Sequence, residues 1–167
     1  MIKQSDIDDR GLQMVRILNA PIDLVWEVWT KPEHIQNWWG PHGFTNEVSL
    51  LEPYTGGRYE LTMTGSDGTV YPNRYTYTEV IERKLIAYKH EHGPHFIAHI
   101  EFEDLGEQTK IIWTMLFRDR EEFIQTVPVY EKNTNVEITL KSSHPAPATL
   151  RSMSWEGDYS PKYYRRV

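Results

Sequence analysis

A regular alternation of apolar and polar residues runs from about residue 45 to residue 117 and constrains the fold more than any other feature. In residues 58–64, RYELTMT, the side chains of Tyr59, Leu61 and Met63 alternate with polar ones, as in a strand with one buried face. Similar segments occupy residues 45–53, 69–81, 85–92, 96–103 and 109–117. Short turns join them, so together with an edge strand at 12–18 they predict an antiparallel meander of six or seven strands.

Two short helices are expected between the edge strand and this meander, in a segment that holds four of the six tryptophans. The first helix begins near Pro21 and has one apolar stripe, formed by Ile22, Val25, Trp26 and Trp29. The second is predicted to begin at Thr30, which stands three residues before Glu33 in the spacing of a capping box. Its apolar side is formed by Ile35, Trp38 and Trp39. A helix pair and an antiparallel sheet place the chain in the α+β class.

The composition fits one globular domain over residues 1–167, since 39% of the residues are hydrophobic and 25% are charged. The formal net charge of −6 weighs against nucleic acid as a partner. No apolar run is long enough to predict insertion into a membrane. The chain has no cysteine, and its first residues, MIKQSDIDDRG, lack the apolar segment of a signal peptide. A cytoplasmic location is therefore expected.

Several segments resemble, in order and spacing, the Hsp90 ATPase activator homologue family. They are APIDLVWEVWTKPEHIQNWWGP, GGRYELTMTGSDG, the strand that carries Glu79, and FEDLGEQTKIIWTMLF. The resemblance covers about residues 12–126. That family belongs to the START-like (SRPBCC) helix-grip superfamily, which also holds lipid-transfer proteins, plant allergens of the Bet v 1 type and aromatase/cyclases. The resemblance implies a curved antiparallel sheet that grips a long C-terminal helix, with an internal cavity between them.

The C-terminal segment departs from that family pattern. Its four prolines are Pro128, Pro145, Pro147 and Pro161, and its apolar residues Val136, Ile138 and Leu140 alternate with period two. Because proline breaks a helix interior, we expect no uninterrupted helix of about 20 residues in this atypical tail, residues 128–167. The sheet would then be covered by a shorter helix, an added strand or a partner subunit in a homodimer.

The aromatic residues offer a candidate ligand site. By resemblance, the end of the second helix and the loop after it lie at the mouth of a cavity, and the strands form its wall. The candidate ligand-binding residues are Trp38, Trp39, Phe44, Tyr59, Leu61, Met63, Tyr75, Tyr77, Trp113 and Met115. Such a wall suits a small hydrophobic or aromatic molecule with a few polar atoms. The same residues also fit an ordinary core, and Trp26 and Trp29 are expected to belong to the core.

The polar residues give little support for catalysis or for a metal site. The segment HEHGPH, residues 90–95, contains three histidines but no further ligand at a diagnostic spacing, so we expect exposed side chains and no metal. Glu79 shares the strand phase of Tyr75, so it could act as an acid or base if it were buried beside the cavity, as could Glu101. No nucleophile, P-loop or dinucleotide motif is present, and no cofactor is expected.

Two classes of function therefore stay open. One is the binding of a small hydrophobic or aromatic ligand in the interior without catalysis, with a cyclase or isomerase as its enzymatic variant. The other is a protein-interaction module with a chaperone partner, which the family name suggests and which needs an exposed docking face. A continuous cavity favours the first, and a filled core with a large surface patch favours the second.

Overall fold

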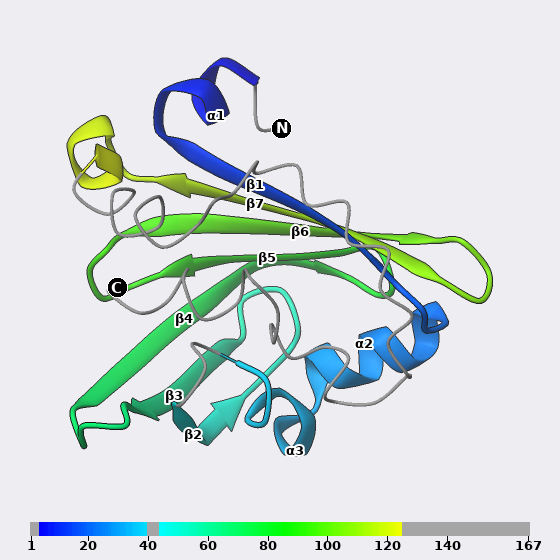
Figure 1. Ribbon diagram of the computed structural model, residues 1–167, viewed down its shortest axis with the longest axis horizontal. Coiled ribbons are helices and arrows are strands. Elements are labelled where there is room, and N and C mark those ends of the chain that lie inside the picture. Colours follow the sequence, from blue (N-terminus) through cyan, green and yellow to red (C-terminus); the bar gives the residue numbers. More distant parts are fainter. Residues whose placement is uncertain (1–3, 40–43, 125–167) are drawn as a thin grey trace.

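The computed structural model describes residues 4–39 and 44–124, and its frame is one antiparallel sheet in the order β1-β7-β6-β5-β4-β3-β2. The strands are β1 (Gly11–Leu18), β2 (Thr45–Leu51), β3 (Arg58–Thr64), β4 (Val70–Ile81), β5 (Leu85–His90), β6 (Phe96–Asp104) and β7 (Thr109–Phe117). Figure 1 shows that the sheet curves, with α2 and α3 together at one end and α1 beside the other. The predicted α+β helix-grip class and the seven-stranded meander are confirmed, with β1 at the sheet edge.

One face of the sheet carries most of the core. Strand register places Tyr59 opposite Tyr75, and Ile100 opposite Trp113, so that buried side chains from neighbouring strands project on the same side. The tryptophans that follow α2 and α3 pack against this side. We call it the inner face, and the opposite side the outer face. The period-two pattern of the sequence is therefore explained by one buried and one largely exposed face.

The helix pair forms as predicted, but its details differ. α2 spans Ile22–Thr30 and α3 only Pro32–Ile35. Thr30 does not cap α3, because its hydroxyl donates to the Trp26 carbonyl 2.7 Å away and Lys31 takes the cap position without a side-chain bond. Pro32 then occupies the first turn, where a missing N–H costs nothing.

The buried side of α2 is also rotated relative to the predicted stripe. Val28 is buried in its place, whereas Trp26 is only partly buried and meets Phe102 edge to face at 5.5 Å. Trp29 is buried as expected. The expectation that Trp26 is a full core residue is therefore wrong: it lies at the margin of the helix–sheet contact.

A third helix, α1 (Gln4–Arg10), precedes β1 and was not evident from the sequence. It folds back so closely that a Cβ atom on Gly11 would lie 2.7 Å from the Ile7 Cα atom, which explains the glycine at this position. The Arg10 guanidinium donates hydrogen bonds to the carbonyls of Phe117 and Arg118. α1 is thereby held against the end of β7.

The described chain ends in a helical segment, residues 120–124, which begins after Asp119. The Asp119 carboxylate accepts a hydrogen bond from the Glu122 N–H at 2.8 Å, as an N-cap does. The expectations for residues 128–167, including the absence of a long helix and cover by a partner subunit, lie outside the described residues. None of the described helices is both long enough and apolar enough to cross a membrane.

Candidate functional site

An aromatic cluster on the inner face is centred on Trp39, which is 3% exposed. Its ring centroid lies 5.4 to 6.4 Å from those of Trp29, Trp38, Tyr59, Tyr75, Tyr88 and Trp113. Four of these six pairs are edge to face, a geometry that aromatic quadrupoles prefer, and the other two are tilted. We call this set the Trp39 cluster.

Hydrogen bonds hold residues 36–39 in place, and this segment positions Trp39 against the sheet. The Trp38 indole N–H donates to the Val28 carbonyl at 3.2 Å, which ties the end of α3 back onto α2. The Asn46 amide donates to the Gln36 carbonyl at 3.1 Å and to the Trp39 carbonyl, which ties the same segment to β2. Asn46 is a positioning residue that the sequence did not single out.

The structure brings most of the predicted ligand-binding residues together. Those that are buried on or against the inner face are Trp38, Trp39, Tyr59, Leu61, Met63, Tyr75, Tyr77, Trp113 and Met115. Phe44 is the exception: it is partly buried and pairs with Tyr71, with ring centroids 5.7 Å apart. Phe44 lies beside the turn at Gly65 and packs against the margin of the core.

The inner face also carries uncharged polar groups. Burial raises the pKa of the Tyr75 and Tyr77 hydroxyls far above the usual value, so both keep their protons. Trp29 is buried, and its indole N–H has no hydrogen-bond partner among the described residues. A buried indole N–H normally finds an acceptor.

His90 is a buried member of this face, contrary to the expectation of an exposed strand-end histidine. It is 5% exposed and lies between the rings of Tyr75 and Phe96, at centroid distances of 4.7 and 5.1 Å. Its Nδ1 is 2.8 Å from the Pro94 carbonyl oxygen and its Nε2 is 3.1 Å from Oδ1 of Asn73. Both partner atoms are oxygens that only accept, so the neutral ring can donate to only one of them.

We expect His90 to make the protein less stable as the pH falls from about 6.5 towards 4. Burial lowers the pKa of His90 from 6.5 to about 4, partly opposed by the hydrogen bond to Pro94. Between these values the unfolded chain binds a proton that the folded chain does not, which costs about 3 kcal/mol in full. Urea unfolding at several pH values measures this, with His90→Gln as the variant that should lose the slope in that window. An imidazole signal of His90 that titrates above pH 6 would contradict it.

The glutamates proposed as acid or base lie on the wrong side of the sheet. A β-bulge between Tyr77 and Glu79 turns Glu79 to the outer face, opposite Ala87, where it is exposed. Glu101 is also exposed on that face, opposite Leu85. The prediction that Glu79 faces the same side of the sheet as Tyr75 is therefore wrong. No group of three or more histidine, aspartate or glutamate side chains in the described part of the chain could hold a metal ion.

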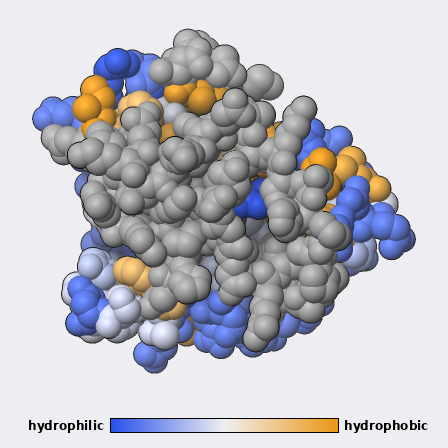
Figure 2. Space-filling view, viewed as in Figure 1, coloured by the Kyte–Doolittle hydropathy of each residue, from blue (hydrophilic) through white to orange (hydrophobic). Residues whose placement is uncertain are grey.

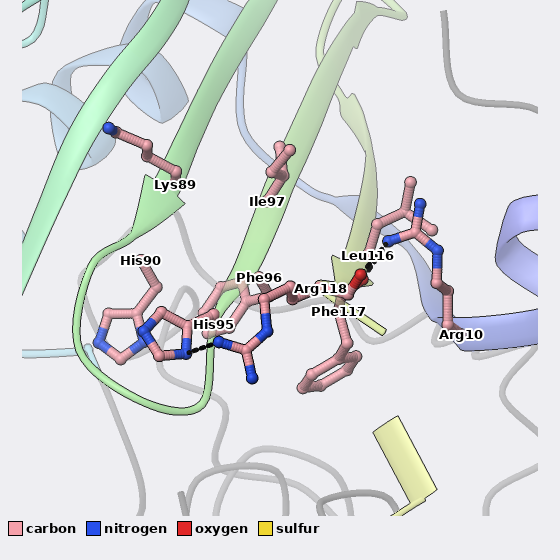
Figure 3. A pocket seen from close by; sticks show the side chains of 9 residues that line it. All are labelled: Arg10, Lys89, His90, His95, Phe96, Ile97, Leu116, Phe117 and Arg118. Atoms are coloured by element: carbon pink, nitrogen blue, oxygen red, sulfur yellow. Dashed lines mark hydrogen bonds between the residues drawn. The ribbon is translucent and has the colours of Figure 1, made fainter. Parts of the chain in front are cut away.

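A pocket of about 370 Å³ lies where β5 ends and β6 begins, beside the end of β7 (Figure 3). Five of its lining residues are arginine, lysine or histidine: Arg10, Lys89, His90, His95 and Arg118. The other four are apolar: Phe96, Ile97, Leu116 and Phe117. None of the ten predicted ligand-binding residues lines it. The sequence did not predict this pocket, because Arg10 reaches it only through the unexpected helix α1.

Comparisons with solved structures support the fold. A protein from Nitrosomonas europaea is 19% identical, with a TM-score of 0.67 over 77% of this chain and 86% of that one. A protein from Mycobacterium smegmatis is 21% identical, with a TM-score of 0.65 over 73% and 81%. An AHSA1-like protein from Aeromonas hydrophila is 18% identical, with a TM-score of 0.55 over 62% and 74%. At such identities these likenesses establish the fold alone.

The family follows from the sequence match. No curated protein matches the chain. A family model described as "Activator of Hsp90 ATPase homolog 1-like protein" matches residues 19–150. This range includes the helix pair and six of the seven strands, and it extends past residue 126, where the resemblance described above ends. The chain belongs to the activator of Hsp90 ATPase homolog 1-like family, within the SRPBCC helix-grip superfamily.

Proposed function

We propose that the protein binds a small hydrophobic or aromatic molecule against its inner face, without catalysing a reaction. The observation that supports this most is the buried indole N–H of Trp29, which lacks a partner among the described residues in the middle of the Trp39 cluster. An ordinary core satisfies such a donor. A ligand with an apolar body and one acceptor atom would satisfy it and would pack against the surrounding rings.

The chemistry of this face favours an uncharged ligand. The Tyr75 and Tyr77 hydroxyls keep their protons, and His90 is neutral above about pH 4. These groups offer hydrogen bonds without a formal charge. The rings of the Trp39 cluster present edges and faces for edge-to-face contact with an aromatic ligand.

Neither glutamate can serve as the base of a cyclase or isomerase on the inner face. Cyclisation or isomerisation on the inner face needs a group that moves a proton there, and Glu79 and Glu101 both point to the outer face. His90 is on the correct side, but its Nδ1 is engaged with the Pro94 carbonyl. Binding without catalysis is therefore the better-supported function.

A chaperone-binding function would need a contiguous docking face. Apart from the neighbours Val70 and Tyr71, the large exposed apolar residues of the described chain are spread over different strands, turns and the last helical segment: Ile17, Tyr54, Val70, Tyr71, Ile81, Ile97, Leu105 and Ile124. In Figure 2 the hydrophobic residues among the coloured atoms form small separate groups between hydrophilic ones. This distribution supports ligand binding over a docking module.

The test uses N-phenylnaphthylamine, a neutral aromatic probe that accepts excitation energy from nearby tryptophans. We expect the probe to bind and to quench tryptophan emission chiefly through Trp38, Trp39 and Trp113, so a variant with all three changed to phenylalanine should lose most of the transfer. Trp26→Phe is the matched control, because Trp26 is only partly buried at the helix margin.

The interpretation requires that the triple variant stay folded, which a circular dichroism melt checks. If the triple variant unfolds, the single variants Trp38→Phe and Trp113→Phe are used instead, and each should lose part of the energy transfer. Full energy transfer in a folded triple variant, or no probe binding to the unmodified protein, would contradict the proposed site.

A further inference from the structure

We propose that the pocket beside the ends of β5 and β7 is a second binding site, which takes a small organic anion with an apolar body, such as a medium-chain carboxylate. It lies at one end of the sheet and is lined from both faces, by Lys89, Ile97 and Leu116 on the outer face and by His90, Phe96 and Phe117 on the inner face. None of the ten residues predicted for the ligand site lines it, so it is separate from that site. Nothing in the function proposed above depends on it.

The floor of the pocket is a row of outward-facing side chains. Lys89 lies opposite Ile97, and Ile97 lies opposite Leu116, so these side chains project from one face of three adjacent strands. Ile97 is 48% exposed although it stands in the middle of the row. An exposed isoleucine between basic groups provides apolar contact for a ligand chain.

The walls of the pocket are basic. Arg10, Lys89 and Arg118 line it, and no carboxylate does, although the whole chain carries a net charge of −6. Figure 3 shows Lys89 on one side of Ile97 and Arg10 on the other side, beyond Leu116. Positive charge therefore flanks the apolar row at both ends, which favours the binding of an anion along it.

The existing partners of these cations leave them able to bind an anion. Lys89 is 3.4 Å from Glu91, and Nε of Arg118 is 3.1 Å from Asp119 and 3.7 Å from Glu122, but Lys89 and Arg118 are both more than half exposed. Such surface pairs contribute little and exchange readily. Arg10 donates to backbone carbonyls and forms no ion pair within the described residues.

The combination of walls and floor selects an amphipathic anion. An inorganic anion would gain nothing from Ile97 and Leu116, and a neutral apolar molecule would gain nothing from the basic walls. An arginine guanidinium matches the planar geometry of a carboxylate. A volume of about 370 Å³ accommodates a carboxylate with a short hydrocarbon chain or a ring.

Octanoate is the test probe, with octanol and octylammonium as neutral and cationic controls of the same chain length. Methyl NMR signals of Ile97 and Leu116 are followed during titration. We expect saturable shifts with octanoate, much weaker ones with octanol and none with octylammonium, and the octanoate affinity should fall as salt is added. Equal responses to octanoate and octanol, or octanoate shifts confined to the Met63 and Met115 methyls of the inner face, would overturn the proposal.

Two pairs of variants test the charge directly. Lys89→Gln should weaken octanoate binding about three- to tenfold. Its control Lys110→Gln, at the other end of the same face and likewise paired with an acid, should leave the affinity unchanged. At the exposed position 97, Ile97→Glu should abolish binding, whereas Ile97→Lys should retain more of it. If Lys89→Gln and Lys110→Gln behave alike, or if Ile97→Glu binds as well as Ile97→Lys, the pocket does not recognise an anion.

Discussion

Replacing Trp39 by alanine is expected to lower the free energy of unfolding by about 3–5 kcal/mol, which is typical of large-to-small changes at fully buried aromatic positions. Trp39 is 3% exposed and joins the helix pair to the sheet through contacts with Trp38 on one side and with Tyr59 and Trp113 on the other. Its removal would leave a cavity lined by rigid rings, which cannot collapse to fill it. Urea unfolding, followed by far-UV circular dichroism, measures the loss.

Trp26→Ala is the matched control for this change. Trp26 is on α2, but it is partly buried, and it pairs with Phe102. Its truncation should therefore cost clearly less than that of Trp39. Equal losses for the two variants would mean that the cluster around Trp39 is not the centre of the core.

Replacing Gly57 by alanine is expected to cost about 3 kcal/mol, although only one methyl group is added. A Cβ atom at this position would lie 2.1 Å from the Glu52 carbonyl oxygen, so the backbone of the turn must move. That turn holds β4 in place, because the Tyr77 N–H donates to the Gly57 carbonyl at 2.9 Å. The displacement therefore reaches a strand of the inner face.

Gly56→Ala provides the comparison, since it adds the same methyl group one residue earlier. Gly56 has a φ of +87°, but a Cβ atom there would meet nothing within 4 Å. Only the cost of the left-handed backbone applies, about 1 kcal/mol. Thermal or urea unfolding of the two variants should separate them clearly. A loss for Gly57→Ala no greater than that for Gly56→Ala would show that the turn accommodates the methyl group.

Most of the sheet could be predicted because a strand with one buried face has apolar and polar residues in alternation. RYELTMT and TKIIWTMLF appear as β3 and β7 with the bounds that their alternation indicates. The helix pair could be predicted for the same reason, from the apolar spacing of Ile22, Val25 and Trp29. Helix α1 could not, because QSDIDDR carries no apolar stripe and is held by Arg10 and by the close approach at Gly11.

The errors at the candidate site have two physical causes. A bulge changes the face of every later residue in a strand, so the period that links Glu79 to Tyr75 fails after Tyr77. The burial of His90 depends on its strand neighbours: the register sets it opposite Tyr75, and its ring packs against Phe96. The local sequence HEHGPH contains no sign of these neighbours. The alternation of Ile86, Tyr88 and His90 was the available signal that His90 faces inward.

Intermolecular NOEs from bound N-phenylnaphthylamine would show whether the inner face binds a small neutral aromatic ligand. The methyl groups of Met63 and Met115 are the reporters of the inner face, and those of Ile97 report the pocket beside the ends of β5 and β7. We expect NOEs from the probe to Met63 or Met115 and none to Ile97. A bound probe that shows NOEs to Ile97 alone, or to none of these methyl groups, would contradict it.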